Sequence, residues 1–275
     1  MEHTQTSGGS TDPTDEKNAD HGDPQRLVGS DRVLAVLKEL ARHPDGVGLE
    51  EMTRAIGAPK PTVHRALGSL RRAGFADQDG RGRYLLGDEF LRMAFTHHEA
   101  RPEHVRISPL LNTLAARFGE TAHYAVLDGR EVVYRAKVDP PSGAVKLTST
   151  VGGRNPAHCT AVGKLLLAHR LLTLEAVQDW VGADPLPPRT ARTLCTVEEL
   201  HQAFELTRQR GYSIDDQENE TGVNCIALPV FAAAPTVPTG AISMSAVAYR
   251  TPLSTLTDAI EEIRGLLGIL GTPDP

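Results

Sequence analysis

The segment from Gly48 to Gly87 limits what this chain can fold into more strongly than any other part of the sequence. Apolar residues recur at helical spacing in two runs, Leu49–Ile56 and Val63–Leu70, which Gly57-Ala58-Pro59 separates. After the second run, Phe75–Leu86 shows the pattern of a strand, a glycine-containing turn with arginines, and another strand. Two short helices joined by a tight turn and followed by a basic hairpin predict a winged helix-turn-helix, whose second helix can enter a DNA major groove.

The charge of the chain is unevenly distributed, and this distribution favours the same prediction. The formal net charge over all residues is −6. Between Lys60 and Arg83, six basic and two acidic residues give a net charge of +4, so the rest of the chain carries −10. A basic module attached to an acidic one is typical of a DNA-binding domain joined to a domain with another role. A solvated basic helix in an ordinary bundle would carry similar charge, but it would not explain the turn and the hairpin.

Length and composition indicate two domains in a reducing compartment. The chain has 275 residues with 40% hydrophobic content, which is enough for two packed cores. No run approaches the roughly 18 apolar residues of a membrane-spanning helix, so we expect no membrane partner. Three widely separated cysteines favour the cytoplasm. Residues 1–26 lack apolar periodicity and the apolar centre of a signal peptide, and we interpret them as a disordered tail.

The remaining pattern divides the chain into three further parts. Residues 27–87 form the winged helix-turn-helix domain, which begins with a helix over Asp31–Arg42 that Ser30 can cap. Residues 88–102 form a linker helix and hinge, and residues 103–272 form a second domain that opens with a helix ending near Phe118. Paired short strands alternate there with helices, which predicts an α+β fold with an antiparallel sheet. The expected strands are Ala122–Leu127, Val132–Val138, Ala144–Thr148, Asn224–Phe231 and Gly240–Tyr249, and the expected helices are Thr160–Arg170, Leu174–Val181, Val197–Arg210 and Leu253–Leu270.

Several motifs, in a fixed order, point to one family. They are Gly57–Arg65, Gly119–Thr121, Asp128–Tyr134, Gly153–Lys164, Gly211–Asp215 and Gly222–Val230. Together they resemble the IclR family of bacterial transcriptional regulators over about residues 27–270. The resemblance implies a winged helix-turn-helix joined by a helix to a GAF-like effector-binding domain. It also implies a homodimer or dimer of dimers that binds palindromic operators in double-stranded DNA and senses a small metabolite, often an organic acid. Such regulators repress or activate transcription, and we expect a repressor.

Two positions depart from the family pattern. Pro61 stands where the family usually has a small hydroxyl residue, so a hydrogen bond to the DNA backbone or a helix cap is expected to be missing. Proline is tolerated in a first helical turn, so the fold should survive. The loop between Phe231 and Gly240 is apolar, proline-rich and one residue longer than the family's usual polar hairpin.

Side chains at the start of the second helix and on the hairpin are the candidates for DNA contact, because that end of a recognition helix enters the groove. The candidates are Lys60, Thr62, His64 and Arg65 on the helix, and Arg81 and Arg83 on the hairpin. Arg65 is best suited to bidentate recognition of guanine, and the hairpin arginines are expected at phosphates or in the minor groove. Arg71 and Arg72 lie late in the helix, where pairing with surface carboxylates is at least as good an interpretation.

Two strands of the second domain suggest a ligand site, independently of the resemblance. The period of two along a strand divides their side chains between two faces. One face receives Ile226, Leu228, Val230, Ile242, Met244 and Ala246, and the other receives Cys225, Ala227, Pro229, Ala241, Ser243, Ser245 and Val247. If the strands pair, the second face is small and partly polar, which leaves room for a ligand. A sheet face that only packs closely against a helix is the alternative.

The resemblance assigns a set of effector contacts around this face. The set is Gly153, His158, Ala161, Asp215, Cys225, Ser243 and Ser245. Thr160 has the features of a helix N-cap, and the N–H groups at such a helix start favour an anionic ligand. We therefore expect a small organic acid. His158 is ambiguous, because a histidine beside a turn is more often structural.

Other function classes have weaker support. A Cys-dependent hydrolase would use Cys159 or Cys225 as nucleophile with His158 or His123 as base, but no nucleophile-elbow, phosphate-binding or dinucleotide motif accompanies them. A thiol-based redox sensor would need a closely spaced second cysteine, and the spacing of His97, His98 and His104 fits no zinc site. We therefore predict no catalytic residue, no metal and no cofactor.

Overall fold

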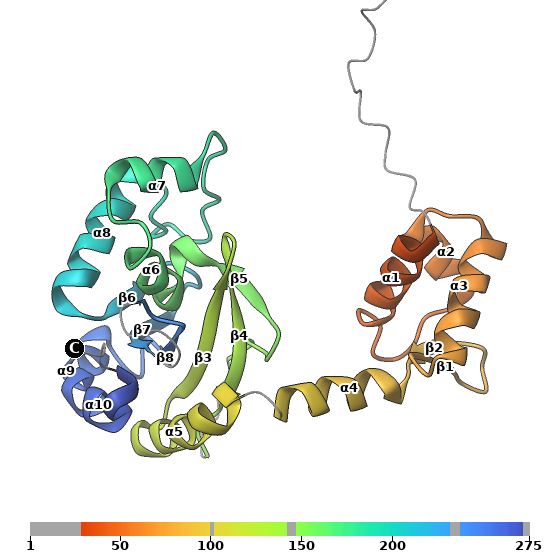
Figure 1. Ribbon diagram of the computed structural model, residues 1–275, viewed down its shortest axis with the longest axis horizontal. Helices are drawn as coiled ribbons and strands as arrows, with labels where there is room; N and C mark the ends of the chain where they lie inside the picture. Colours follow the sequence, from red (N-terminus) through yellow and green to blue (C-terminus); the bar gives the residue numbers. More distant parts are fainter. Residues whose placement is uncertain (1–28, 100–101, 142–146, 232–236, 272–275) are drawn as a thin grey trace, which may run out of the picture. The chain divides into compact units, whose positions relative to one another are not determined.

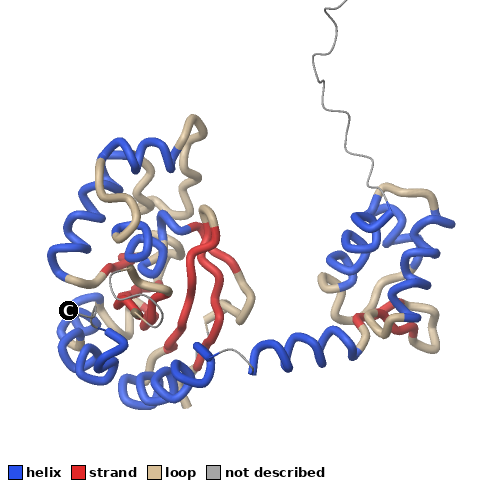
Figure 2. The backbone as a smooth tube through the Cα atoms, in the orientation of Figure 1, coloured by secondary structure: helices blue, strands red, loops and turns tan. Residues whose placement is uncertain are grey.

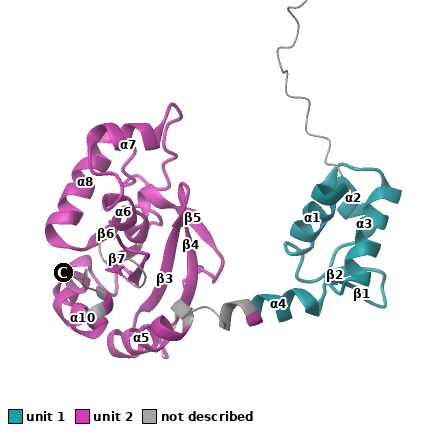
Figure 3. Cartoon of the chain, in the orientation of Figure 1, with its two compact units in different colours: residues 1–95 teal, residues 96–275 magenta. Residues whose placement is uncertain are grey.

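The computed structural model describes residues 29–99, 102–141, 147–231 and 237–271. The chain divides into two compact units, Met1–Phe95 and Thr96–Pro275, which Figure 3 colours separately. The predicted tail over residues 1–26 lies outside the described residues. Among the described residues, no helix combines the length and the apolar character needed to cross a membrane.

The first unit is a small helical domain with a two-stranded hairpin. Its elements are α1 Gly29–Leu40, α2 Leu49–Ile56, α3 Lys60–Arg72, β1 Ala76–Gln78, β2 Tyr84–Leu86 and α4 Asp88–Glu99, the last of which runs past the end of the unit. The apolar stripes of the three helices meet in one core, where Leu40, Met52 and Leu67 are fully buried. Val47 forms an isolated antiparallel bridge with Tyr84, so the hairpin is joined to the segment before α2. The winged helix-turn-helix prediction is confirmed in its element order.

The second unit contains a six-stranded antiparallel sheet with strand order β5-β4-β3-β8-β7-β6. The strands are β3 Thr121–Asp128, β4 Glu131–Val138, β5 Arg154–Pro156, β6 Ser213–Asp216, β7 Val223–Val230 and β8 Gly240–Val247. The helices are α5 Pro102–Phe118, α6 Ala161–Ala168, α7 Leu174–Val181, α8 Val197–Arg210, α9 Leu253–Asp258 and α10 Ile260–Leu267, with short 3₁₀ turns η1 Ala157–Cys159 and η2 Gly268–Gly271.

Helices cover both faces of this sheet, and each face has its own core (Figures 1 and 2). Helices α5, α9 and α10 pack on the face that carries Ile226, Leu228 and Met244. Helices α6, α7 and α8 pack on the opposite face, over Ala125, Ala227 and Ala241. The two faces therefore divide β7 and β8 as the period-two pattern predicts, and β7 pairs with β8 over its whole length. The predicted α+β class with an antiparallel sheet is confirmed.

Some expected element boundaries were wrong. The strands β5 and β6 were not predicted, because each has three or four residues and neither has an apolar run to mark it. The expected last helix is divided at Ala259, and periodicity cannot detect this break because Leu256, Ile260 and Ile263 keep one stripe across it. Strand β8 ends at Val247, two residues before the expected end, and α1 begins at Gly29, before the expected cap. Of the expected strand Ala144–Thr148, residues 144–146 lie outside the described residues and the other two are not in a strand.

Candidate functional site

Helix α3 has one buried face and one exposed face. Val63, Ala66, Leu67 and Leu70 lie in the core of the first unit, whereas Pro61, His64, Arg65, Ser69 and Arg72 are exposed. The turn before α3 depends on Gly57, whose φ of 66° lies in the left-handed region that glycine adopts at little cost. Pro61 occupies the first turn, where its missing N–H breaks no helical hydrogen bond. A stable helix thus presents a cationic, hydrogen-bonding face to solvent.

The predicted contacts on α3 differ in accessibility. His64 and Arg65 are exposed, and Thr62 is half-buried at the flank of the exposed face. Lys60 Nζ lies 3.0 Å from Glu50 Oε1 on α2, and both side chains are mostly exposed. Because an exposed ion pair contributes at most about 1 kcal/mol, a phosphate can compete for this lysine.

The hairpin arginines are also not equivalent. Asp79 accepts hydrogen bonds from the backbone N–H groups of Arg81 and Arg83, at 2.9 and 2.8 Å, and so orders the turn. The Arg83 guanidinium donates to the Gly46 carbonyl oxygen, through Nε at 3.2 Å and also through Nη2. Arg83 therefore fastens the hairpin to the segment before α2, while the Arg81 side chain is exposed near the tip. Arg71 donates to Gln78 Oε1 and Arg72 to Ser69 Oγ, so the partners that the structure shows for them are an amide and a hydroxyl and not the expected carboxylates.

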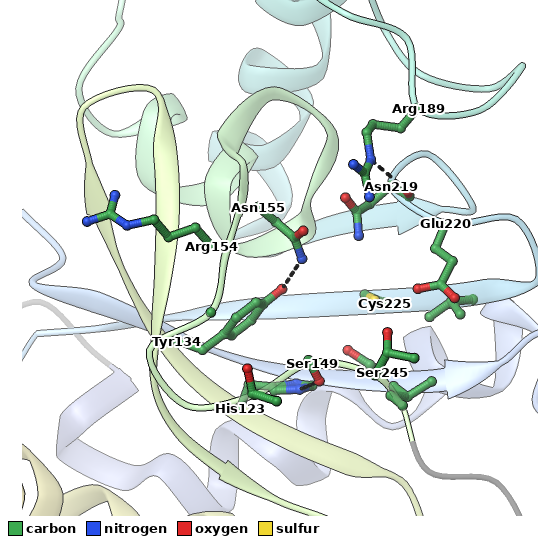
Figure 4. Close-up of a pocket in the computed structure, with 15 residues that line it drawn as sticks. His123, Tyr134, Ser149, Arg154, Asn155, Arg189, Asn219, Glu220, Cys225 and Ser245 are labelled. Carbon is green, nitrogen blue, oxygen red and sulfur yellow. Dashed lines mark hydrogen bonds between the residues drawn. The ribbon is translucent and has the colours of Figure 1, made fainter. Parts of the chain in front are cut away.

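The second unit contains a pocket of about 210 Å³ at one end of the polar sheet face (Figure 4). Its lining residues are His123, Tyr134, Leu147, Thr148, Ser149, Thr150, Gly153, Arg154, Asn155, Arg189, Asn219, Glu220, Val223, Cys225 and Ser245. A Cβ at position 153 would lie 2.8 Å from the Thr150 carbonyl oxygen, so glycine lets the chain turn tightly at this edge. Most of the lining side chains can donate or accept hydrogen bonds, which suits a polar ligand.

The floor of the pocket is built by strand register. Cys225 on β7 pairs with Ser245 on β8, and Ser243 on β8 pairs with His123 on β3. Paired residues share a face, so these side chains lie together on the small, partly polar face of the sheet. Tyr134 of β4 adds a phenol whose ring centre lies 4.9 Å from that of His123, and Asn155 Nδ2 donates to its hydroxyl at 3.2 Å.

Only some of the effector contacts expected from the sequence line the pocket. Gly153, Cys225 and Ser245 line the pocket. Ser243 and Ala161 are buried and do not line it, and His158 is buried with Nε2 3.2 Å from the Pro187 carbonyl oxygen. Thr160 caps α6 by accepting a hydrogen bond from the Gly163 N–H, but the first turn of that helix is not among the lining residues.

Asp215 belongs to a buried charged cluster outside the pocket lining. Its Oδ1 accepts hydrogen bonds from the backbone N–H groups of Glu218 at 2.7 Å and Asn219 at 3.3 Å. Burial raises the pKa of Asp215 to about 7, although Lys164 opposes the rise. Lys164 and Glu218 form a buried ion pair, with 3% and 7% of their side chains exposed. The cluster holds in place the turn that carries Asn219 and Glu220 into the pocket wall.

Several lining residues were not in the sequence-derived set. The period-two rule applied to β3 would have placed His123 on the polar face with Ala125 and Leu127. Arg189, Asn219 and Glu220 come from two loops whose approach no local pattern records.

The chemistry of the cysteines does not favour the thiol-based alternatives. Burial raises the pKa of all three thiols, to about 12 for Cys159, and the nearby Asp215 adds to the rise for Cys159 and Cys225. Nucleophilic attack and oxidation both proceed through the thiolate, which such surroundings suppress. Among the described residues, no group of His, Cys, Asp and Glu is placed to hold a metal ion, and the side chains of His97, His98 and His104 lie outside the described part.

Comparison with known proteins matches both units. The family model described as bacterial transcriptional regulator IclR C-terminal matches residues 104–266, and that of the IclR helix-turn-helix domain matches residues 30–80. The transcriptional repressor IclR of Escherichia coli (strain K12) is 30% identical over 230 residues, which cover 82% of this chain and 81% of that protein. A transcriptional regulator from Rhodococcus sp. RHA1 of known crystal structure is 27% identical, with a TM-score of 0.74 over 86% of this chain and 93% of that one. An IclR homolog from Microbacterium hydrocarbonoxydans, crystallised with 4-hydroxybenzoate, shares the fold at 22% identity, with a TM-score of 0.69 over 86% of this chain and 98% of that one.

Proposed function

This chain belongs to the IclR family of bacterial transcriptional regulators, and from that premise we propose that it is a repressor whose binding to a palindromic operator is controlled by a small organic acid. The family resemblance drawn from the sequence motifs is thereby confirmed. The observation that supports the proposal most directly is that one chain carries both an exposed cationic helix, α3 of the first unit, and a polar pocket in the second unit.

The proposed DNA interface consists of α3 and the hairpin. Arg65 reads a guanine in the major groove, because its guanidinium can donate two parallel hydrogen bonds to O6 and N7. Lys60, Thr62 and His64 make the neighbouring contacts from the first turns of the helix. Arg81 meets the phosphate backbone or the minor groove, and Arg83 supports the hairpin while contributing charge.

We further propose that the protein acts in the cytoplasm as a homodimer or a dimer of dimers. A palindromic operator presents two equivalent half-sites, and a symmetric pair of recognition helices reads both. The proposed effector contacts are the pocket residues Gly153, Cys225 and Ser245, with Asp215, Ser243, Ala161 and His158 supporting them. The role is regulatory and not catalytic.

The DNA interface is tested by selecting duplexes from a random library with the full-length protein, then measuring affinity for the selected site at fixed salt. Arg65→Ala should weaken binding about 5- to 150-fold, which corresponds to the roughly 1–3 kcal/mol expected of a bidentate base contact. Arg117→Ala, an exposed arginine of α5 that pairs with Glu262, is the matched control and should bind as the wild type does. Equal affinity of the Arg65 variant and the wild type would remove Arg65 from the interface.

The effector is tested by repeating the titration with a panel of small carboxylic acids. An acid that binds the pocket should lower operator affinity if the protein is a repressor released by its effector. If only neutral or cationic compounds changed DNA binding, the acid assignment would be wrong.

A further inference from the structure

A side-chain bridge outside the hydrophobic core joins the hairpin of the first unit to helix α3. Arg71 Nη1, in the last turn of α3, donates to Gln78 Oε1 at 2.9 Å. Gln78 Nε2 in turn donates to the Gly82 carbonyl oxygen at 3.1 Å. One amide side chain thus connects α3 with the residue that follows Arg81 in the hairpin turn.

The position of Gln78 in the hairpin explains why its side chain reaches α3. Side chains alternate between the two faces of a strand, so Gln78 shares a face with Ala76 at the other end of β1. Ala76 and Tyr84, the register partner of Gln78, are both buried in the core to which α3 contributes. Gln78 is the last residue of β1, and it is exposed. Its amide therefore faces α3 at the point where the apolar contacts end.

The other contacts of the hairpin do not fix it to α3. Asp79 Oδ1 accepts hydrogen bonds from backbone N–H groups within the turn, and Arg83 donates to the Gly46 carbonyl oxygen before α2. Within residues 60–86, all of which the structure describes, the bond between Arg71 and Gln78 is the hydrogen bond that joins α3 to the hairpin. A two-stranded hairpin is at best marginally stable by itself, and each strand here has three residues. Its side-chain links therefore determine how firmly the turn is held.

The residue that gains most from a firmly held turn is Arg81. Its backbone N–H donates to Asp79, but its side chain is exposed, and within the described residues its guanidinium forms no hydrogen bond or ion pair. The position of the turn decides where this guanidinium can meet a duplex that α3 already contacts. A contact residue that is held in place before binding loses less conformational entropy when it binds.

Arg71 and Arg72 are neighbours in the last turn of α3, and only one of them takes part in the bridge. Arg72 Nη2 donates to Ser69 Oγ at 3.0 Å, which is a bond within the helix. Arg71 donates outside the helix, to the hairpin. The two arginines carry the same charge from adjacent positions, so a comparison of their variants separates the effect of the bridge from the effect of charge.

We propose that Gln78 is a positioning residue of the DNA interface, which Arg71 holds in place and which fixes the hairpin turn relative to α3, so that Arg65 and Arg81 engage the same duplex together. This inference rests on the proposed function, because it takes α3 and the hairpin as the DNA interface. Gln78 and Arg71 act through Arg81, and neither was expected from the sequence to have this role.

The experiment measures the affinity of the full-length protein for the duplex selected from the random library, at several salt concentrations. Gln78→Met keeps the length and the neutrality of the side chain but removes both hydrogen bonds. It should weaken binding about 3- to 10-fold, as should Arg81→Ala. The slope of log affinity against log salt should become shallower by about 1 in both variants, as expected when one charged contact with DNA is lost.

Two further variants serve as controls. Gln78→Thr keeps a residue that favours a strand but is too short for the bridge, and it should behave as Gln78→Met does. Gln202→Met makes the same replacement at an exposed glutamine of α8 and should bind as the wild type does. Far-UV circular dichroism of each variant verifies that its helices are retained.

Double variants distinguish positioning from direct contact with DNA. In the Arg81→Ala background, Gln78→Met should weaken binding by less than about twofold, because the residue through which it acts is absent. In the Gln78→Met background, Arg71→Met should lose most of the effect that it has in the wild type. Arg72→Met should have the same effect in both backgrounds.

Each outcome decides the inference. It is overturned if the two Gln78 variants leave the affinity or the salt slope unchanged, or if the losses from Gln78→Met and Arg81→Ala add in the double variant. In either case the proposed function survives as long as Arg65→Ala still weakens binding. If the library yields no preferred duplex, or if Arg65→Ala binds as the wild type does, the proposed DNA interface fails and this inference fails with it.

Discussion

Replacing Asp215 by asparagine should stabilise the second unit fully at pH 8 and less than half as much at pH 5. The carboxylate is 2% exposed, and burial raises its pKa from 3.8 to about 7. An asparagine oxygen can accept the same two backbone hydrogen bonds, from the N–H groups of Glu218 and Asn219. The substitution therefore removes a buried titratable group while keeping the local geometry.

The magnitude follows from the difference in pKa between the folded and unfolded states. Between pH 3.8 and about pH 7 the folded protein keeps a proton on Asp215 that the unfolded chain has released. The free energy of unfolding consequently falls as the pH rises through this window, by about 1.4 kcal/mol per pH unit. Over the whole window the loss is at most about 4 kcal/mol, and it is complete above pH 7. Asp215→Asn does not incur this loss, so its advantage should grow from pH 5 to pH 7 and then stay constant.

The assay is urea unfolding at pH 5, 6, 7 and 8, followed by fluorescence. Trp180 is the single tryptophan of the chain and lies on α7, so the signal reports the second unit alone. Asp184→Asn, at an exposed position in the loop after α7, is the matched control and should follow the pH dependence of the wild type. The reasoning is refuted if Asp215→Asn is no more stable than the wild type at pH 8, or if its advantage is the same at every pH.

Two further predictions use the same unfolding assay. Lys164→Met should lower the free energy of unfolding by about 3–5 kcal/mol at pH 8, because it leaves Glu218 buried without its partner. The loss should shrink toward pH 5, since burial already raises the pKa of Glu218 and favours its protonated form. A loss that does not vary with pH would contradict this. Gly163→Ala should lower the free energy of unfolding by about 3 kcal/mol or more, because a Cβ there would overlap the Ala157 carbonyl oxygen. Gly265→Ala, on an open face of α10, should instead raise it by up to about 1 kcal/mol. Similar effects of the two substitutions would show that the close approach of α6 to Ala157 does not require glycine.

The sequence carried most of the local information about the first unit. Helices α2 and α3, the turn at Gly57 and the hairpin depend on spacing and turn chemistry within about forty residues, and the structure has them as expected. The bounds of α7 and α8 were also predicted, and in the structure Thr173 and Thr196 cap these helices while Gly182 and Gly211 follow their last residues. What the sequence did not indicate in this unit is the attachment of Arg83 to Gly46, which joins residues 37 positions apart.

In the second unit the sequence predicted the polar face of β7 and β8 but not the pocket built on it. Cys225 and Ser245 were identified because alternation along a strand is local. The strands β5 and β6 are too short to leave a pattern, and they exist only because β4 and β7 offer edges on which to pair.

The amino-acid order alone thus determined the two-part architecture, the DNA-binding module and the chemical character of one sheet face, because short-range periodicity and turn residues encode them. The tertiary structure alone decided which distant groups meet: His123 with Ser149, Lys164 with Glu218 fifty-four residues away, and Arg189 beside Asn219. Burial arises from such meetings, so the raised pKa of Asp215 becomes visible only when the chain is folded.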